Sequence, residues 1–417
     1  MSAGDTPWRE TTLGELLSIK HGFAFLGEYF GDSGSHVVLT PGNFNEEGGF
    51  VDRREKSKWY RGPIPAEYVL DADSLLVAMT EQAEGLLGSS ALVPRSSLYL
   101  HNQRLGLVQV RDPCRADTRF LYYLFNHRPV RQQIRASASG TKIRHTSPTR
   151  IEAVVVPVPG VEQQRRIAST LTAYDDLIEN CQRRIRILED MARGLYREWF
   201  VHFRFPGADS LPQIESPLGR IPQGWKALSC SGVASYFNGY AFKPAQLGVE
   251  GLPVIKIKEL KAGVVVDTPR NDGGEVPEKY HVLDGDLLFS WSADLDVYLW
   301  RHGEGLLNQH LFNVLPNEGF TTVFLYHCLK EAMPRFRAIS LGATMHHIKR
   351  SALDQVVVAV PPAVHRERFV ALAGPMHAGV RRLTKKIELL RRTRDLLLPR
   401  LMSGQLDLRS AEGTLPA

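Results

Sequence analysis

Side chains suited to reading nucleic-acid bases stand at matching places in the two halves of this chain. Asn102-Gln103-Arg104 is matched by Asn308-Gln309-His310, and we call each triplet an amide loop. Asn and Gln can form paired hydrogen bonds with adenine, and Arg with guanine, each worth about 1–3 kcal/mol of discrimination. Alternatively, the asparagines cap a strand or hold their loops. Because the pair recurs, this alternative is slightly favoured for Asn102 and Asn308.

A second pair of polar segments, which we call the basic loops, spans Gly140–His145 and Gly342–Lys349. Lysine and arginine there suit phosphate, and each such contact steepens the salt dependence of binding by about one unit. Glycine at the start of each loop would allow close backbone approach. Tyr240 and Trp291 could stack at a base step, although such aromatic residues more often pack. The candidate DNA contacts are Asn102, Gln103, Arg104, Lys142, Arg144, His145, Tyr240, Asn308, Gln309, His310, His346, His347 and Lys349.

Motifs of catalysis are absent from the sequence. It has no phosphate loop ending in Gly-Lys-Ser or Gly-Lys-Thr, no Asn-Pro-Pro-aromatic motif and no paired cysteines for zinc. His346-His347 is a poor metal site, because adjacent histidines point apart in a strand. The Asp71/Asp73 and Asp284/Asp286 pairs lie in Val-Leu-Asp-x-Asp segments that favour a role in turns. We therefore expect no catalytic residues, no metal site and no enzyme activity in this chain by itself.

These loops belong to a duplicated domain. Trp8 and Gly22-Phe-Ala-Phe25 recur as Trp225 and Gly239-Tyr-Ala-Phe242, at an offset of 225 − 8 = 217. Val154–Pro159 recurs as Val356–Pro361 at an offset of 202, so the second copy is 217 − 202 = 15 residues shorter. Shortening between matched blocks indicates one scaffold that carries two different sets of loops.

Each copy is followed by a segment with a seven-residue apolar repeat. The two seams run from Ile167 to Trp199 and from Phe369 to Leu401, and nineteen of their twenty positions are apolar or aromatic. Such a repeat is typical of a coiled coil, so we predict that the two helices pair. The alternative is that each helix packs only on its own domain. The first seam covers 199 − 167 = 32 residue steps, or about 48 Å of helix.

Antiparallel pairing would place one domain at each end of this rod, whereas parallel pairing would place both at one end. Arg394 is the one charged seam residue, and in the antiparallel register it falls opposite Tyr174, next to Asp175 and Asp176. We predict that Arg394 contacts one of these carboxylates and helps to fix the register. Alternatively, the arginine stem extends out of the seam to water.

Composition sets broad bounds. The chain has 417 residues, a formal charge of +6 and a pI near 9.1. This length allows two domains with cores of their own, and the basic balance permits nucleic acid without proving it. Apolar stretches are short, no secretory signal is evident and the four cysteines are dispersed, so a cytoplasmic location is expected.

Several motifs resemble the conserved regions of type I restriction–modification specificity subunits. They are Glu162–Ala168, Asp175–Asn180, Arg184–Ala192, Glu198–Gly207, Leu218–Trp225 and Leu396–Asp407. The resemblance implies an α/β (α+β) fold with two target recognition domains, an antiparallel helix pair and pseudo-twofold symmetry. The implied domains are 1–160 and 225–362, with spacer helices at 161–204 and 363–404, a connector at 205–224 and a tail at 405–417.

The resemblance also implies a function. Each domain would read one half of a bipartite double-stranded DNA site, and the helices would set the gap and dock methyltransferase subunits. Those modification subunits would carry S-adenosylmethionine and methylate adenine, while restriction subunits would use ATP and Mg²⁺, so that this chain binds no cofactor. The alternatives are a stand-alone sequence-specific DNA-binding protein and a self-contained DNA-modifying enzyme.

Overall fold

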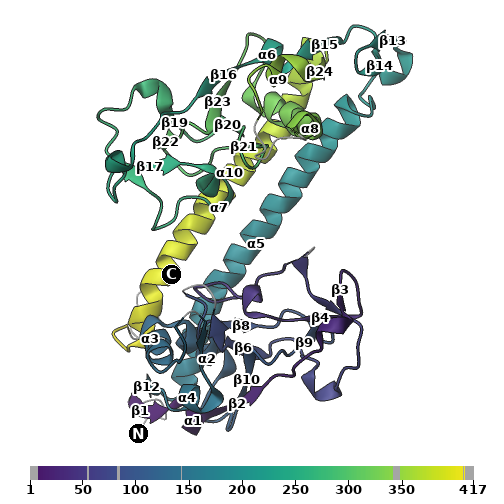
Figure 1. The fold of residues 1–417 in the computed structure, drawn as a ribbon. Helices are drawn as coiled ribbons and strands as arrows, with labels where there is room; N and C mark the ends of the chain where they lie inside the picture. Colours follow the sequence, from purple (N-terminus) through teal and green to yellow (C-terminus); the bar gives the residue numbers. More distant parts are fainter. Residues whose placement is uncertain are drawn as a thin grey trace, which may run out of the picture. The chain divides into compact units, whose positions relative to one another are not determined.

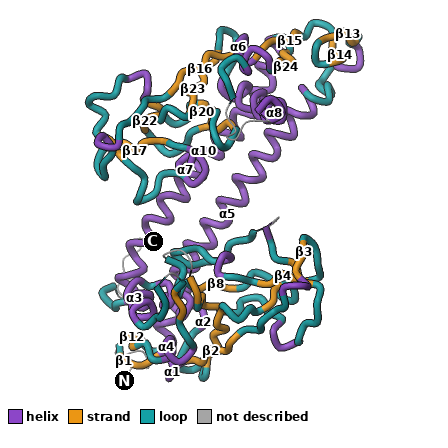
Figure 2. Tube along the Cα trace, in the orientation of Figure 1, coloured by secondary structure: helices purple, strands orange, loops and turns teal. Residues whose placement is uncertain are grey.

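The computed structural model describes residues 8–53, 56–81, 85–141, 143–340, 348–406 and 408. The chain forms two compact units (Figures 1 and 2). Unit 1 comprises Met1–Leu177 with Leu390–Ala417, and unit 2 comprises Ile178–Leu389. No helix among the described residues is long and apolar enough to cross a membrane.

Unit 1 is built on two four-stranded sheets. The first is antiparallel, in the order β2 (Leu17–His21), β10 (Leu105–Val110), β6 (Leu75–Ala78) and β8 (Ser90–Leu92). The second has the order β3 (Phe30–Gly31), β5 (Trp59–Tyr60), β4 (His36–Val38) and β9 (Tyr99–Leu100), with β4 and β9 parallel. Unit 1 also contains two strand pairs: β1 (Arg9–Thr12) with β12 (Val155–Val158), and β7 (Thr80–Glu81) with β11 (Arg144–His145).

Short helices cover the first sheet of unit 1. They are α1 (Leu13–Leu16), α2 (Thr118–Asn126), α3 (Arg128–Ala136) and α4 (Pro148–Glu152), with 3-10 turns η1 (Gly27–Tyr29), η2 (Pro41–Asn43) and η4 (Ala66–Tyr68). The Asp117 carboxylate starts α2 by accepting a hydrogen bond from the Phe120 amide at 2.9 Å. The apolar face of α2, with Phe120 and Leu124, is then buried in the same cluster as Val77 of β6.

Unit 2 repeats this plan. Its first sheet has the order β16 (Ala234–Asn238), β23 (Leu311–Pro316), β20 (Leu287–Ser290) and β21 (Asp296–Leu299). Its second has β18 (Arg270–Asn271), β17 (Leu252–Ile255), β22 (Gly305–Leu307) and β19 (His281–Val282), with β17 and β22 parallel. The pairs are β15 (Lys226–Ser229) with β24 (Val357–Val360), and β13 (Gln213–Ser216) with β14 (Gly219–Pro222). Its helices are α6 (Cys230–Val233), α7 (Ile257–Ala262), α8 (Thr322–Ser340) and α9 (Ala352–Gln355), with turns η5 (Ala208–Ser210), η6 (Pro244–Gln246) and η7 (Glu278–Tyr280).

The two strand orders confirm the duplication and the predicted mixed α and β fold. The residue after each repeated tryptophan pairs with the last valine of its own copy, Arg9 with Val158 and Lys226 with Val360. The first and last matched blocks of each copy are therefore neighbours in a sheet. This strand pair therefore joins the beginning of each copy to its end.

The two predicted long helices are α5 (Val161–Phe200) and α10 (Ala363–Met402), each of 40 residues. All twenty predicted seam positions are buried or half-buried. The pairing is antiparallel in both units. In unit 1, Leu171 of α5 shares a cluster with Leu401 of α10. In unit 2, Tyr196 of α5 packs on Phe369 of α10, with ring centroids 5.6 Å apart.

The register contact predicted for Arg394 is confirmed within unit 1. Its Nη1 lies 2.6 Å from Oδ1 of Asp175, and the hydroxyl of Tyr123 on α2 donates to the other oxygen of the same carboxylate at 2.6 Å. Asp175 therefore connects three helices. Burial and the neighbouring Asp175 raise the pKa of Tyr123, so its hydroxyl keeps its proton and remains a donor.

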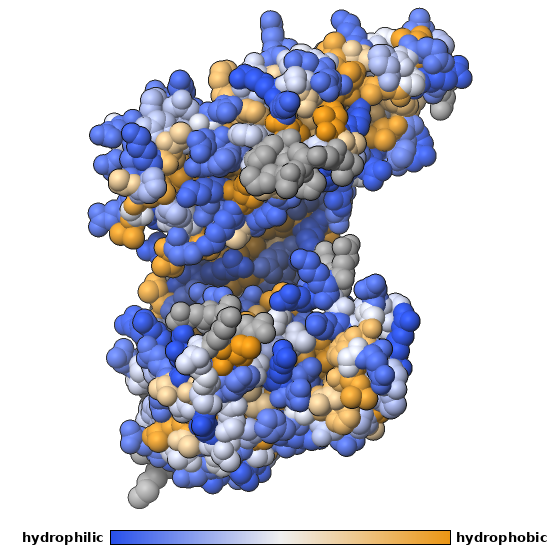
Figure 3. Space-filling model, viewed as in Figure 1, coloured by the Kyte–Doolittle hydropathy of each residue, from blue (hydrophilic) through white to orange (hydrophobic). Residues whose placement is uncertain are grey.

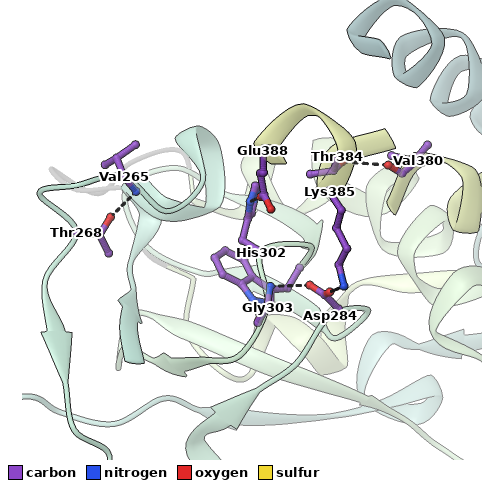
Figure 4. Close-up of polar contacts among 10 residues, drawn as sticks. Val265, Thr268, Asp284, His302, Gly303, Val380, Thr384, Lys385 and Glu388 are labelled. Carbon is purple, nitrogen blue, oxygen red and sulfur yellow. Dashed lines mark hydrogen bonds and ion pairs between the residues drawn. The ribbon is translucent and has the colours of Figure 1, made fainter. Parts of the chain in front are cut away.

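In unit 2, a turn of the domain is fixed to α10 (Figure 4). Asp284 accepts a hydrogen bond from the Gly303 amide at 2.7 Å and pairs with the Lys385 ammonium at 2.7 Å. Burial by itself raises the pKa of Asp284, but Lys385 and the Gly303 amide outweigh it and hold that pKa below its usual value. Asp286 accepts from the Leu283 amide at 2.8 Å. The turn role expected of these aspartates is confirmed.

Candidate nucleic-acid interface

The amide loop of unit 1 joins β9 to β10. The Phe23 amide donates to the His101 carbonyl at 2.9 Å, and the Gln103 amide donates to the Phe23 carbonyl at 3.0 Å. The side chain of Asn102 accepts from the Arg104 amide at 3.0 Å. Asn102 therefore holds the loop, whereas the side chains of Gln103 and Arg104 are exposed. These two are the members of the triplet available to a ligand.

The amide loop of unit 2 has the same construction. The Tyr240 amide donates to the Leu307 carbonyl at 2.7 Å, and the Gln309 amide donates to the Tyr240 carbonyl at 2.9 Å. Asn308 is buried and accepts from the His310 amide at 3.4 Å. The structure thus gives both asparagines the loop-holding role that was the alternative to base contact. Gln309 and His310 are exposed.

Two glycines that the sequence reasoning did not select make these loops possible. A Cβ added at Gly22 would lie 2.1 Å from the Asn102 carbonyl oxygen, and one at Gly239 would lie 2.3 Å from that of Asn308. Only glycine permits this approach. The joint recurrence of Gly-aromatic-Ala-Phe and Asn-Gln is the signal that would have linked them.

The basic loop of unit 1 is a tight hairpin. Ser139 and His145 exchange two backbone hydrogen bonds of 2.9 and 2.8 Å. Gly140 has φ +98°, and an added Cβ would lie 2.1 Å from the Ile143 carbonyl oxygen. The close approach that Gly140 allows is therefore an approach to the backbone of its own loop. Arg144 is half-buried and His145 is exposed, while Lys142 lies outside the described residues.

The two loops of unit 1 meet at Met79, the residue after β6. The Met79 amide donates to the Arg104 carbonyl at 3.0 Å, and the Met79 carbonyl accepts from the Thr146 amide at 2.9 Å. Thr146 directly follows the basic loop. One backbone position therefore joins two polar loops that are about forty residues apart in the chain.

Trp291 takes the corresponding place after β20 in unit 2. Its carbonyl accepts from the Ile348 amide at 3.2 Å, and its ring centroid lies 5.9 Å from that of His310. Lys349, which is exposed, follows Ile348. The ring also packs on Phe312 at 5.8 Å, which is the packing role considered for this tryptophan. Gly342, His346 and His347 lie outside the described residues.

Tyr240 has a packing role as well. It is half-buried, and its ring centroid lies 4.9 Å from that of Phe242 and 5.4 Å from that of Tyr280. Tyr240 therefore supports the amide loop of unit 2 through both its backbone and its ring.

The chemistry available at both places is that of hydrogen-bond donors and cations. Among the residues that the structure describes, no group of three or more His, Cys, Asp or Glu is placed to hold a metal ion. On the face drawn in Figure 3, most side chains are hydrophilic and the apolar ones form small patches. Exposed Gln, Arg, His and Lys next to one another suit the polar edges of bases and phosphate oxygens.

Comparison with known proteins agrees with this chemistry. Residues 6–189 match the family described as the type I restriction modification DNA specificity domain. The curated relatives and solved structures that resemble the chain are likewise specificity subunits of type I systems. The resemblance identified from its motifs is thereby confirmed.

Members of this family are similar to the chain over long stretches. It is 24% identical over 305 residues to the type I restriction enzyme MjaIX specificity subunit of Methanocaldococcus jannaschii, covering 69% of this chain and 68% of that protein. It is 25% identical over 211 residues to the EcoBI specificity subunit of Escherichia coli, covering 49% and 44%. The fold is that of the S subunit of a type I system from M. genitalium, with a TM-score of 0.61 at 16% identity, covering 96% of this chain and 98% of that one.

Proposed function

We propose that this chain is the DNA-reading subunit of a type I restriction–modification complex. Each unit reads one half of a bipartite double-stranded site through its amide and basic loops. The observation that carries the proposal is that Met79 and Trp291, which follow equivalent strands of the two copies, each contact both loops of their own copy. Two similar sites in one chain suit two half-sites in one DNA molecule.

The two amide loops expose different side chains, which suits two half-sites of different base sequence. Unit 1 presents Gln103 and Arg104, whereas unit 2 presents Gln309 and His310. Arginine pairs with guanine through two parallel hydrogen bonds, and an imidazole ring cannot reproduce that geometry. We therefore expect the two units to read different bases at this position.

We further propose that this chain supplies recognition and no catalysis. Modification subunits would bind S-adenosylmethionine and transfer methyl groups to adenine, and restriction subunits would use ATP and Mg²⁺ for translocation and cleavage. The exposed faces of α5 and α10 would dock these subunits, and the paired helices would set the gap between the half-sites. All twenty seam positions are buried or half-buried, which supports a stiff spacer.

Methylation mapping of DNA from cells that carry the complex tests this proposal. Replacing residues 1–160 by the first domain of another family member should change one half-site and leave the other half-site and the gap unchanged. Arg104→Ala should relax one position of one half-site by about 1–3 kcal/mol. The matched control is Arg128→Ala, an exposed arginine on α3 outside both loops. Loss of both half-sites together would refute the assignment of one unit to each.

A second assay separates the competing functions. The purified chain is incubated with duplex DNA and S-adenosylmethionine, with and without modification subunits. Methyl transfer by the chain alone would establish a self-contained enzyme instead. Tight specific binding by the chain alone, with no affinity for modification subunits, would establish a stand-alone DNA-binding protein.

A further inference from the structure

A pocket of unit 2 lies beside the amide loop but outside the predicted contacts. Its lining residues are Tyr236, Phe237, Asn238, Lys279, Tyr280 and Arg350. The lining set includes two cations and no carboxylate. Lys279 and Arg350 are both exposed, so the pocket presents positive charge to solvent.

Each of the two cations of this pocket contacts a neighbouring tyrosine, Lys279 through its ring and Arg350 through its carbonyl oxygen. The Lys279 ammonium lies 5.0 Å from the centroid of the Tyr280 ring. One guanidinium nitrogen of Arg350 donates to the Tyr236 carbonyl at 3.0 Å, which leaves its remaining donors for a ligand. A cation held against an aromatic face loses less freedom when it binds an anion than a lysine extended into water.

Unit 1 has the same arrangement at the corresponding tyrosine. Tyr68 ends η4 as Tyr280 ends η7, and the Lys20 ammonium lies 4.7 Å from the Tyr68 ring centroid. The Tyr68 ring packs on Phe23 at 5.3 Å, as Tyr280 packs on Tyr240. We call these two pairs, Lys20 with Tyr68 and Lys279 with Tyr280, the tyrosine–lysine platforms.

The two platforms take their lysines from different positions of the duplicated domain. Lys20 lies on β2, and the residue 217 positions later is Phe237. Lys279 precedes Tyr280 in η7, whereas Glu67 precedes Tyr68 in η4. Inheritance of one ancestral side chain does not account for this. A ligand that binds both units and requires a cation at this place accounts for the lysine beside each tyrosine.

Both platforms abut the amide loops. Phe23 and Tyr240 contact the platform tyrosines with their rings and pair with Gln103 and Gln309 through their backbones. Resting on the proposed function, we propose that each platform binds a DNA backbone phosphate that flanks the bases read by the neighbouring amide loop. Such a contact fixes the register of the domain on the duplex and reads no base itself.

The test uses the full chain in its modification complex. The variants are Lys279→Gln and Lys20→Gln, with Lys226→Gln and Lys56→Gln as matched exposed lysines in unit 2 and unit 1. Binding to a duplex that carries the mapped site, and to an unrelated duplex of equal length, is measured from 50 to 200 mM salt. Each platform variant should lower the slope of log K against log salt by about one unit. The two duplexes should be weakened by the same factor, and the control variants should change neither value.

Phosphate ethylation interference locates the contact. Lys279→Gln should lose interference at one half-site only, and Lys20→Gln at the other half-site only. An unchanged slope, or a loss confined to the specific duplex, would overturn the phosphate assignment. Lys20 also donates to the Glu67 carbonyl at 3.1 Å, so Lys279→Gln is the decisive arm if Lys20→Gln destabilises unit 1. A wild-type complex that prefers no bipartite sequence would instead refute the proposed function, while the slopes on the unrelated duplex would still test the platforms.

Discussion

Replacing Arg394 by leucine tests the three-helix contact at Asp175. The Arg394 and Asp175 side chains are 25% and 29% exposed. Removing one partner of a fully buried pair costs about 3–5 kcal/mol, whereas an exposed pair contributes about 0–1 kcal/mol. For Arg394→Leu we expect about 2 kcal/mol, because Tyr123 still donates to the carboxylate that remains. The fold should persist while the helix ends in unit 1 open more often.

Hydrogen exchange measured by mass spectrometry reads this effect locally. A loss of about 2 kcal/mol corresponds to roughly 30-fold faster exchange in peptides that cover residues 167–177 and 390–402. Arg392→Leu, at an exposed position two residues away, is the matched control. Asp175→Asn combined with Arg394→Leu should cost about 1.5 kcal/mol less than the sum of the single changes. Equal exchange in Arg394→Leu and Arg392→Leu, or additivity of the two changes, would refute the reasoning.

Two further predictions concern stability. His327 and His377 pair through their Nε2 atoms at 2.8 Å, and burial lowers the pKa of His327 to about 3 and that of His377 to about 4. Since the unfolded chain binds these protons more tightly, unit 2 keeps its full stability above about pH 6.5 and loses about 2 kcal/mol per histidine by pH 5. Thermal unfolding of wild type and His377→Gln against pH should show a weaker acid loss in the variant; parallel curves would contradict this. Gly22→Ala and Gly239→Ala should each destabilise their unit by roughly 1–3 kcal/mol through overpacking, whereas Gly194→Ala, which meets nothing within 4 Å on α5, should raise the melting temperature slightly. If Gly22→Ala left the stability of unit 1 unchanged, the loop at Asn102 would move aside without cost, which would contradict this prediction.

Periodicity and recurrence predicted the parts of the fold that local pattern determines. A seven-residue apolar repeat requires a partner helix, and one charged seam residue required a carboxylate, which Asp175 supplies. Repetition also predicted one scaffold for both copies, and the strand orders of the two copies agree with this prediction. Asp284 and Asp286 were correctly assigned to a turn, where Asp286 accepts a hydrogen bond from the Leu283 amide.

The arrangement of the candidate site could not be predicted in the same way. The loops meet at Met79 and Trp291 because of long-range strand register, which an alternating pattern does not encode. Asn102 and Gln103 are equally polar, yet only the structure shows that one holds the loop and the other is exposed. Comparison of the two copies in the sequence could not reveal the tyrosine–lysine platforms, because Lys20 and Lys279 are not at equivalent positions.

The order of segments in the two units has a consequence for synthesis of the protein. Unit 2 is one continuous stretch, Ile178–Leu389, inserted within unit 1. The core of unit 1 includes Leu401 and Met402 together with Ile167 and Leu171. On the ribosome, the second domain can thus finish folding while the first still lacks its last apolar strip. A stop codon between the codons of Leu389 and Leu401 would therefore damage the domain that was translated first.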